Sequence, residues 1–305
     1  MADATGIVLA TGRRGAIAQL SALLYRHTAV RGYLLLAPAL LIMVAAIVAP
    51  LITILTMSLW SVSGYATDTT LSLGNYQAMT THPMYQVLIG RSLVLSGLAT
   101  TITVIACYPM AYFVAFHGGR YKSLLLIVMT LPFWTSYLLR VFAWKLILGY
   151  EGLLNGSLQS LGLIDEPLTV FLYSKTAVVT VLAHSWAVFA LLPIYASLES
   201  INRTYLEAAA DLGDTPAQRF WRIVFPLSLP GVAAAFFMMF IPTVGDFITP
   251  ALVGGPDAMM VGNLIQANFG QMNNHPAGAA LAVVMILTIC IAGLVFMALT
   301  RLVRR

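Results

Sequence analysis

The residues of this sequence that could do chemistry are single polar side chains inside long apolar segments. Asp246 is the acidic residue placed deepest in such a segment, and Arg140 and His184 lie in two others. A charged side chain at the centre of a membrane helix costs about 2.5–3.5 kcal/mol on insertion scales. Such a residue therefore needs a local reason to be there, either a role in moving a solute or a polar partner.

Asp246 lies among residues that interrupt helices. Pro242, Gly245 and Pro250 surround it, so we predict that its helix is bent or broken. Irregular backbone at membrane depth is tolerated only against protein or a water-filled cavity. One hypothesis is that Asp246 faces a translocation pathway and attracts a cationic substrate. The alternative is a structural ion pair or hydrogen bond with a neighbouring helix, with Arg140 as the candidate partner.

Aromatic side chains accompany these polar residues. Trp134 and Tyr137 precede Arg140, and aromatic faces can hold amines by cation–π contact, although aromatics near span ends more often form an interfacial belt. Lys145 is expected to reach the interface along its apolar stem. His184 has no acidic residue at metal-ligand spacing, so we predict a hydrogen-bonded packing residue and no metal site. The candidate pathway residues are Asp246, Trp134, Tyr137, Arg140 and Thr243.

The composition excludes a soluble fold. Of the 305 residues, 60% are hydrophobic and 9% charged, whereas soluble domains average about 25% charged residues. The mean hydropathy is +0.88. The net charge is +5, from 16 Lys and Arg against 11 Asp and Glu. The Lys and Arg lie singly at the ends of apolar segments, so no nucleic-acid partner is expected. Cys107 and Cys290 both lie in apolar runs and predict neither a disulfide framework nor a metal site.

Six apolar runs are long enough to cross a bilayer, which takes about 18 residues or more. Polar residues and turn formers separate the runs. The predicted fold class is therefore all-α, a polytopic membrane protein with six transmembrane helices. The runs cover residues 33–59, 92–116, 123–148, 176–198, 230–253 and 277–300.

The distribution of Lys and Arg predicts the orientation in the membrane. Six spans place both termini on one side, and with the termini inside, twelve of the 16 Lys and Arg are cytoplasmic. Residues 1–32 are basic but lack the short apolar stretch and cleavage site of a secretory signal. We therefore predict a cytoplasmic N-terminal segment over 1–32 and a transmembrane domain over 33–305.

The chain has no segment for soluble chemistry. The longest pieces outside the spans, residues 1–32 and 60–91, are too short for a folded domain of about 100 residues. No phosphate-binding G-x-x-x-x-G-K-[ST] loop occurs, because residues 119–123 end in Lys-Ser without the required glycines. No nucleophile and base, and no paired intramembrane carboxylates, are evident. We predict that the chain is not an enzyme and that any ATP hydrolysis occurs on other chains.

The one long cytoplasmic loop, residues 199–229, has clear helix signals. Asn202 can cap a first helix over 203–212, and Gly213 can adopt the left-handed conformation that ends it. The segment 215–218 reads Thr-Pro-Ala-Gln, a capping box with proline at the first helical position.

The second helix of this loop is predicted to run to about Val224 and to be stopped by Pro226. It contains too much apolar surface for a solvated linker, and the first helix carries three consecutive alanines, residues 208–210, that allow close approach. These features favour docking of a partner over the alternative, in which the helix pair lies on its own bundle at the interface.

Residues of this loop match a known pattern. Glu-Ala-Ala is followed after three residues by Gly, after nine more by Ile, and after one more by Phe-Pro. This order resembles the EAA loop of ATP-binding-cassette (ABC) importer permeases, with phenylalanine in place of the usual leucine. In that family the loop is a coupling helix that sits in a groove of the ATPase subunit. The resemblance assigns ATPase coupling to Glu207, Ala208, Ala209, Gly213, Ile223, Phe225 and Pro226.

The resemblance extends along the chain. Residues 132–140, 152–155 and 242–255 look like the spermidine/putrescine permease subfamily, specifically its first permease subunit. Membership implies the type I ABC importer permease fold in a bacterial inner membrane. It also implies a second homologous permease, two copies of an ABC ATPase subunit that bind ATP and Mg, and a periplasmic solute-binding protein. No cofactor is expected in this chain itself.

Polyamine import is thus the favoured function, and alternatives remain open. Related permeases for other solutes, such as an amino-acid derivative, an opine or ferric ion, share parts of the same stretches. An ion-coupled secondary transporter would need ionisable residues in corresponding spans of each half, and no acid in the first three spans matches Asp246. An intramembrane enzyme would need a nucleophile–base pair or a metal constellation.

Overall fold

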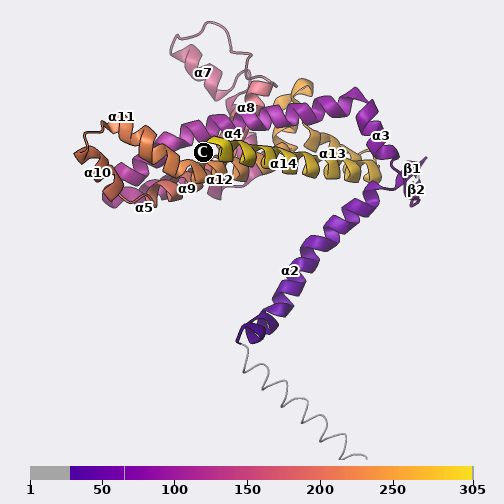
Figure 1. Ribbon diagram of the computed structural model, residues 1–305. Helices are drawn as coiled ribbons and strands as arrows, with labels where there is room; N and C mark the ends of the chain where they lie inside the picture. The colour runs from indigo at the N-terminus through magenta and orange to yellow at the C-terminus, as the bar shows by residue number, and fades with distance from the viewer. Residues whose placement is uncertain (1–27, 65, 304–305) are drawn as a thin grey trace, which may run out of the picture. The chain divides into compact units, whose positions relative to one another are not determined.

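The computed structural model describes residues 28–64 and 66–303 (Figure 1). The chain divides into two compact units, Met1–Thr56 and Met57–Arg305. Most of the predicted N-terminal segment, residues 1–27 of 1–32, lies outside the described residues. Helix α2 (Thr28–Ser58) accounts for the described part of the first unit.

Helix α2 contains the first predicted span. Its segment Leu35–Ser58 has 24 residues and a mean hydropathy of 2.7. At 1.5 Å per residue this segment is about 36 Å long, enough to cross a hydrocarbon core of about 30 Å. Pro38 and Pro50 lie inside the helix, as transmembrane helices tolerate.

The second unit begins with a small connector. The strands β1 (Ser61–Ser63) and β2 (Ala66–Asp68) pair antiparallel, and the helix α3 (Gly74–Thr81) follows them. The Asn75 side chain donates hydrogen bonds to the carbonyls of Ser58 at 3.1 Å and Trp60 at 2.7 Å. These bonds hold the start of α3 to the residues that leave α2.

Helix α4 (Pro83–His117) packs against α8, α9 and α12. It contains the second predicted span but begins nine residues earlier than the sequence predicted, because Pro83 is well placed in the first turn of a helix. Its buried face carries Ser92, Ser96, Thr100 and Thr103, small residues that let neighbouring helices approach.

The third and fourth predicted spans are each bent at a break. Helices α5 (Lys122–Thr130) and η2 (Leu131–Trp134) meet α6 (Tyr137–Ile147) at 86°, and α8 (Lys175–Ser185) meets α9 (Ala187–Glu199) at 47°. These two bent pairs correspond to the apolar runs predicted over 123–148 and 176–198. Within the described residues, four helices are long and apolar enough to cross a membrane, and there are up to six spans if each bent pair counts as one.

The fifth span is longer than predicted at its start. Segments α11 (Pro216–Arg219), η3 (Phe220–Val224) and α12 (Phe225–Val244) form one run of 29 residues. The prediction that Pro226 stops the helix is wrong. The segment η3 is a π-helical turn in which the Phe225 N–H bonds to the Phe220 carbonyl, and this wider turn accommodates the proline ring.

The remaining elements surround these spans. A break after Val244 leads to the π-helical turn η4 (Pro250–Gly254), as the residues around Asp246 predicted. The sixth span is α14 (His275–Val303). The short elements are η1 (Gly119–Tyr121), α7 (Leu153–Ser160), α10 (Thr204–Asp211), η5 (Pro256–Ala258) and α13 (Val261–Gly270).

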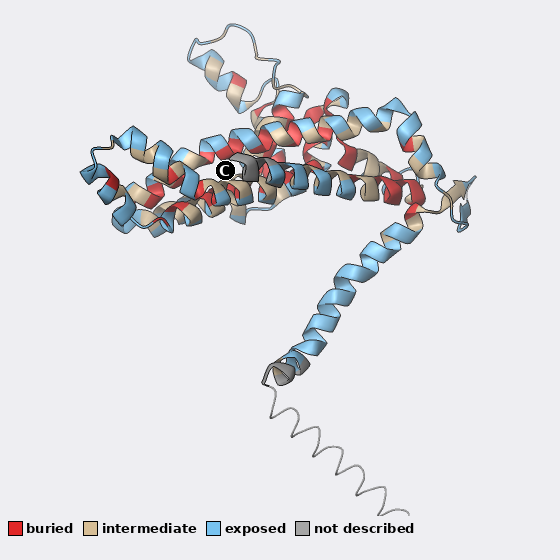
Figure 2. Ribbon diagram, in the orientation of Figure 1, coloured by how far each residue is buried: buried red, intermediate tan, exposed pale blue. Residues whose placement is uncertain are grey.

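The second unit buries its apolar side chains in three clusters, which lie along the inward faces of the helices (Figure 2). One cluster joins α6 and α8 to η4 around Leu182 and Met239. A second joins α4, α9 and the start of α12 around Ile194 and Val224. The third joins α12, α13 and α14 around Leu281. The predicted all-α membrane architecture is confirmed.

Candidate functional site

The loop between α9 and α12 folds as two helical segments joined by a sharp bend. Helix α10 ends at Asp211, and Gly213 has a φ of +90°, the left-handed conformation that its position predicted. Asn202 Oδ1 accepts the N–H of Thr204 at 3.0 Å, but the helix begins at Thr204 and its N-cap residue is Arg203, so the prediction that Asn202 caps it is wrong. The capping box is confirmed, because Thr215 Oγ1 accepts the N–H of Gln218 and Gln218 Oε1 accepts the N–H of Thr215.

An open apolar groove lies between the two segments of this loop. Its volume is about 500 Å³. The Leu212 side chain in this groove is 88% exposed, and Ala209, which also lines the groove, is buried. Trp221 in the second segment is 64% exposed. The loop therefore presents apolar surface outward instead of covering it with its own helices. Residues lining the groove include Tyr205, Ala208, Leu212, Ile223, Pro226 and Leu227.

Phenylalanine at position 225 fits the loop without disturbing it. The Phe225 ring is half-buried and lies 6.1 Å from the ring of Tyr108 on α4 and 5.2 Å from that of Trp221. Phe220 also packs edge-on against Tyr108, at 5.9 Å. These aromatic contacts fix the base of the second segment on α4, so the departure from the usual leucine gains packing area.

A second polar cluster lies where the fifth span breaks. Asp246 is 7% exposed, and its Oδ2 accepts hydrogen bonds from the hydroxyl of Tyr137 and, at 2.7 Å, from that of Thr249. Its Oδ1 accepts the backbone N–H groups of Ile248 at 2.9 Å and Thr249 at 3.4 Å. The carboxylate thus caps the turn that restarts the chain after α12.

Arg140 does not pair with Asp246, so the hypothesis of an ion pair between them is wrong. Its guanidinium donates to the carbonyls of Ser185 at 2.7 Å and Thr135 at 3.0 Å, and also to that of Phe133 at 3.3 Å. The guanidinium carbon also lies 4.4 Å from the centre of the Phe133 ring. Arg140 therefore satisfies carbonyls that the breaks in the third and fourth spans release.

The other candidate residues have different surroundings. Thr243 is fully buried, and its hydroxyl donates to carbonyls of its own helix, at Met239 and Phe240. Trp134 is 81% exposed at the break of the third span. His184 accepts a hydrogen bond from Trp144 Nε1 at 3.0 Å, which confirms it as a hydrogen-bonded residue.

Two residues of this cluster were missed by the sequence reasoning. Thr249 lies three positions after Asp246, the spacing of a capping pair, and that signal could have found it. Gly262 at the start of α13 has no comparable signal. A Cβ there would lie 2.5 Å from the Gly245 carbonyl oxygen and 2.9 Å from that of Asp246. Glycine at this position allows α13 to pack directly on the break.

Comparisons with known proteins agree with this arrangement. The family model described as "Binding-protein-dependent transport system inner membrane component" matches residues 107–305. The spermidine/putrescine transport system permease protein PotB of Haemophilus influenzae is 36% identical over 215 residues, covering 70% of this chain and 74% of that protein. The protein of the same name from Escherichia coli is 32% identical over 234 residues, covering 77% and 84%.

A solved structure shares the fold. It is a bacterial ABC transporter involved in the import of the acidic polysaccharide alginate, with a TM-score of 0.74 at 17% identity, covering 94% of this chain and 100% of that chain. The family match, the relatives and the helical architecture lead to one conclusion. This chain belongs to the family of binding-protein-dependent transport system inner membrane components and is a type I permease subunit of an ABC importer.

Proposed function

We propose that this permease imports polyamines as one half of a permease pair. The complete importer would contain a second homologous permease, two ATPase subunits and a periplasmic solute-binding protein. The proposed solute rests on the relatives, which are named for spermidine and putrescine transport and cover most of this chain. A structural neighbour of the same fold is an alginate transporter in complex with a periplasmic protein, which supports the proposed assembly.

The observation that carries the proposal is the open apolar groove of the loop between α9 and α12. A groove of about 500 Å³ lined by exposed leucine side chains fits docking on another chain. In the proposed mechanism the ATPase subunits bind ATP and Mg, and their closure moves this loop. Glu207 is exposed at the loop surface, where it is available to the ATPase.

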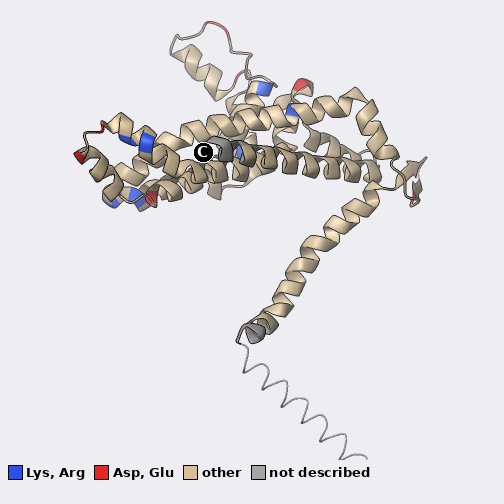
Figure 3. Ribbon diagram, in the orientation of Figure 1, with Lys and Arg blue, Asp and Glu red and all other residues tan. Residues whose placement is uncertain are grey.

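The proposed orientation places this loop and both termini in the cytoplasm. Charged side chains gather at the end of the second unit that carries α10 and α11 (Figure 3). Positively charged residues near span ends favour the cytoplasmic side. The basic residues at this end are Arg120, Lys122, Arg203, Arg219 and Arg222.

The proposed attraction for a cationic solute comes from Asp246. Its carboxylate accepts hydrogen bonds, but in the described part of the chain no Lys or Arg forms an ion pair with it, so its negative charge is not neutralised. The Tyr137 ring lies 5.6 Å from that of Trp186, and aromatic faces beside a carboxylate suit an ammonium group. Tyr137 and Asp246 are therefore the proposed core of the pathway, with Trp134 at the exposed break.

A competition experiment tests the proposed solute. The complete importer would be reconstituted in proteoliposomes, and uptake of radiolabelled spermidine would be measured with excess unlabelled putrescine, amino-acid derivative or ferric complex. Competition by putrescine alone is the expected result. Absence of spermidine uptake, together with uptake of a radiolabelled amino-acid derivative or ferric complex in a parallel assay, would retain the importer and replace the solute.

A further inference from the structure

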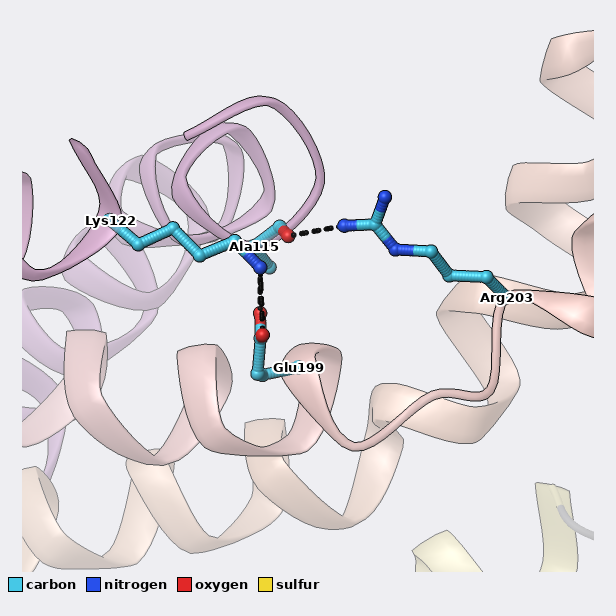
Figure 4. Close-up of polar contacts among 4 residues, drawn as sticks. All are labelled: Ala115, Lys122, Glu199 and Arg203. Atoms are coloured by element: carbon cyan, nitrogen blue, oxygen red, sulfur yellow. Dashed lines mark hydrogen bonds and ion pairs between the residues drawn. The ribbon is translucent and has the colours of Figure 1, made fainter. Parts of the chain in front are cut away.

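Two polar contacts join the base of the loop between α9 and α12 to the ends of other spans (Figure 4). At the last residue of α9, Glu199 accepts the Nζ of Lys122 on both carboxylate oxygens, at 2.7 Å each. Lys122 is the first residue of α5. Four residues after Glu199, the Arg203 guanidinium donates to the Ala115 carbonyl at 3.3 Å.

The Arg203 contact lies at the end of a helix. Ala115 is in the last turn of α4, where carbonyl groups have no partner within the helix and carry partial negative charge. A guanidinium at this end is therefore favoured both by the hydrogen bond and by the helix dipole. This bond ties the start of the loop to the second span.

The turn between α4 and α5 positions Lys122 for its contact with Glu199. Gly119 has a φ of +49°, and Gly118 is packed so closely that a Cβ there would lie 2.8 Å from the Cγ of Lys122. The turn thus directs the Lys122 stem toward α9. Residues 119–123 end in Lys-Ser but lack the glycines of a phosphate-binding loop. In the structure Lys122 of this segment binds Glu199.

Chain connectivity shows why such contacts would matter. The loop is joined covalently to α9 and to the continuous run from α11 through α12, so these helices follow any movement of the loop. Helices α4 and α5 do not adjoin the loop in the sequence, and α4 contacts it through the packing of Tyr108 on Phe220 and Phe225. Yet α5 leads through η2 to α6, whose first residue, Tyr137, bonds Asp246.

We propose that Lys122, Glu199 and Arg203 are positioning residues that make the second and third spans move with the loop when the ATPase closes. The inference rests on the proposed docking of the loop on an ATPase. The ion pair is partly exposed, with side-chain exposures of 21% for Lys122 and 41% for Glu199. Such pairs contribute little to folding stability, so variants at these positions should still fold and assemble.

The test uses charge reversal in the complete importer in proteoliposomes, with ATP hydrolysis and spermidine uptake measured on the same preparation. Lys122→Glu and Glu199→Lys are each expected to lower the uptake per ATP hydrolysed by about fivefold or more, a typical size for coupling between sites. ATP hydrolysis and assembly should persist. The double exchange, Lys122→Glu with Glu199→Lys, should restore the ratio, and Arg203→Gln should lower it.

Arg120→Glu is the matched control. Arg120 lies in the same turn and bonds only the neighbouring Tyr121 among the described contacts, so its reversal changes the charge without cutting a link. The uptake per ATP hydrolysed by the Arg120→Glu variant should stay at the wild-type value. The inference would be overturned if Lys122→Glu and Glu199→Lys both kept the wild-type uptake per ATP hydrolysed. It would also be overturned if Arg120→Glu lowered this quantity as much as they do.

Two further outcomes separate the inference from the proposed function. Failure of the wild-type importer to couple uptake to ATP would overturn the proposed function and this inference with it. The neutral variant Lys122→Gln guards against misfolding caused by reversal. If this variant and the double exchange both lose assembly and hydrolysis together, the contact is purely structural and the inference is wrong.

Discussion

Asp246 combines two properties that a sequence alone cannot separate. Its oxygens cap the turn after α12 and accept two side-chain hydroxyls, which is a structural role. Its charge has no cationic partner among the described residues, and the proposed role is that this charge attracts a cationic solute. The capping bonds need an acceptor, whereas attraction of a solute needs the charge, so substitution can distinguish the two roles.

We expect Asp246→Asn to lower polyamine uptake by about tenfold or more while assembly and ATP hydrolysis persist. The variant keeps an oxygen for the backbone N–H groups but loses a charge attraction of about 1–4 kcal/mol. Thr249→Val is the comparison, because it removes one hydrogen bond to the carboxylate and keeps the charge. Equal losses of uptake in both variants would mean that Asp246 acts only as a structural acceptor.

Gly262 is expected to be intolerant of a side chain. In Gly262→Ala the new Cβ would meet the Gly245 carbonyl oxygen at 2.5 Å, so we expect a loss of about 1–3 kcal/mol in the free energy of unfolding. Thermal unfolding of the purified protein in detergent measures this. Gly97→Ala is the matched control, since a Cβ there has no neighbour within 4 Å. A melting temperature as high as that of Gly97→Ala would contradict the close packing of α13.

The helical run Pro216–Val244 connects the two candidate sites directly. It begins at the groove of the loop and ends two residues before Asp246. A π-helical turn, in place of the predicted stop at Pro226, keeps the run continuous. Movement of the loop would therefore reach the break at Asp246 along one element.

Gly213 tests the bend that shapes the groove. Its φ is +90° and a Cβ there would meet no atom within 4 Å, so a substitution acts through backbone conformation alone. Gly213→Val should cost about 1–2 kcal/mol at the bend and weaken co-purification of the ATPase subunit. Gly213→Asn should be milder, because asparagine adopts the left-handed conformation more readily. Equal ATPase binding by both variants would show that the bend does not shape the docking surface.

Patterns of neighbouring residues predicted where helices begin, end and break, but they did not predict which helices bend or run on without a break. The Thr215 capping box, the left-handed Gly213 and the break around Asp246 depend on neighbouring residues, and all three occur as predicted. The bend at Trp186 depends on Arg140, 45 residues away from the Ser185 carbonyl that it binds. No pattern within the fourth span could reveal that bond, and the same holds for Gly262.

The chain as a whole is a permease subunit of an ABC importer. It has long apolar helices and a loop with an exposed groove, and it shows no groups that could form a metal site within the described residues. The solved neighbour supports the fold of a single permease. In the proposed mechanism, movement driven by ATP enters at the groove and reaches the break near Asp246 along the helical run Pro216–Val244.

Dependence of uptake on ATP tests this account most directly. Spermidine uptake would be followed in proteoliposomes containing the complete importer, with ATP or a non-hydrolysable analogue enclosed with the ATPase subunits. The account predicts accumulation against a gradient with ATP alone, and its loss in Gly213→Val. Accumulation that is equal with ATP and the analogue would contradict the central claim that this chain couples ATP hydrolysis to solute movement.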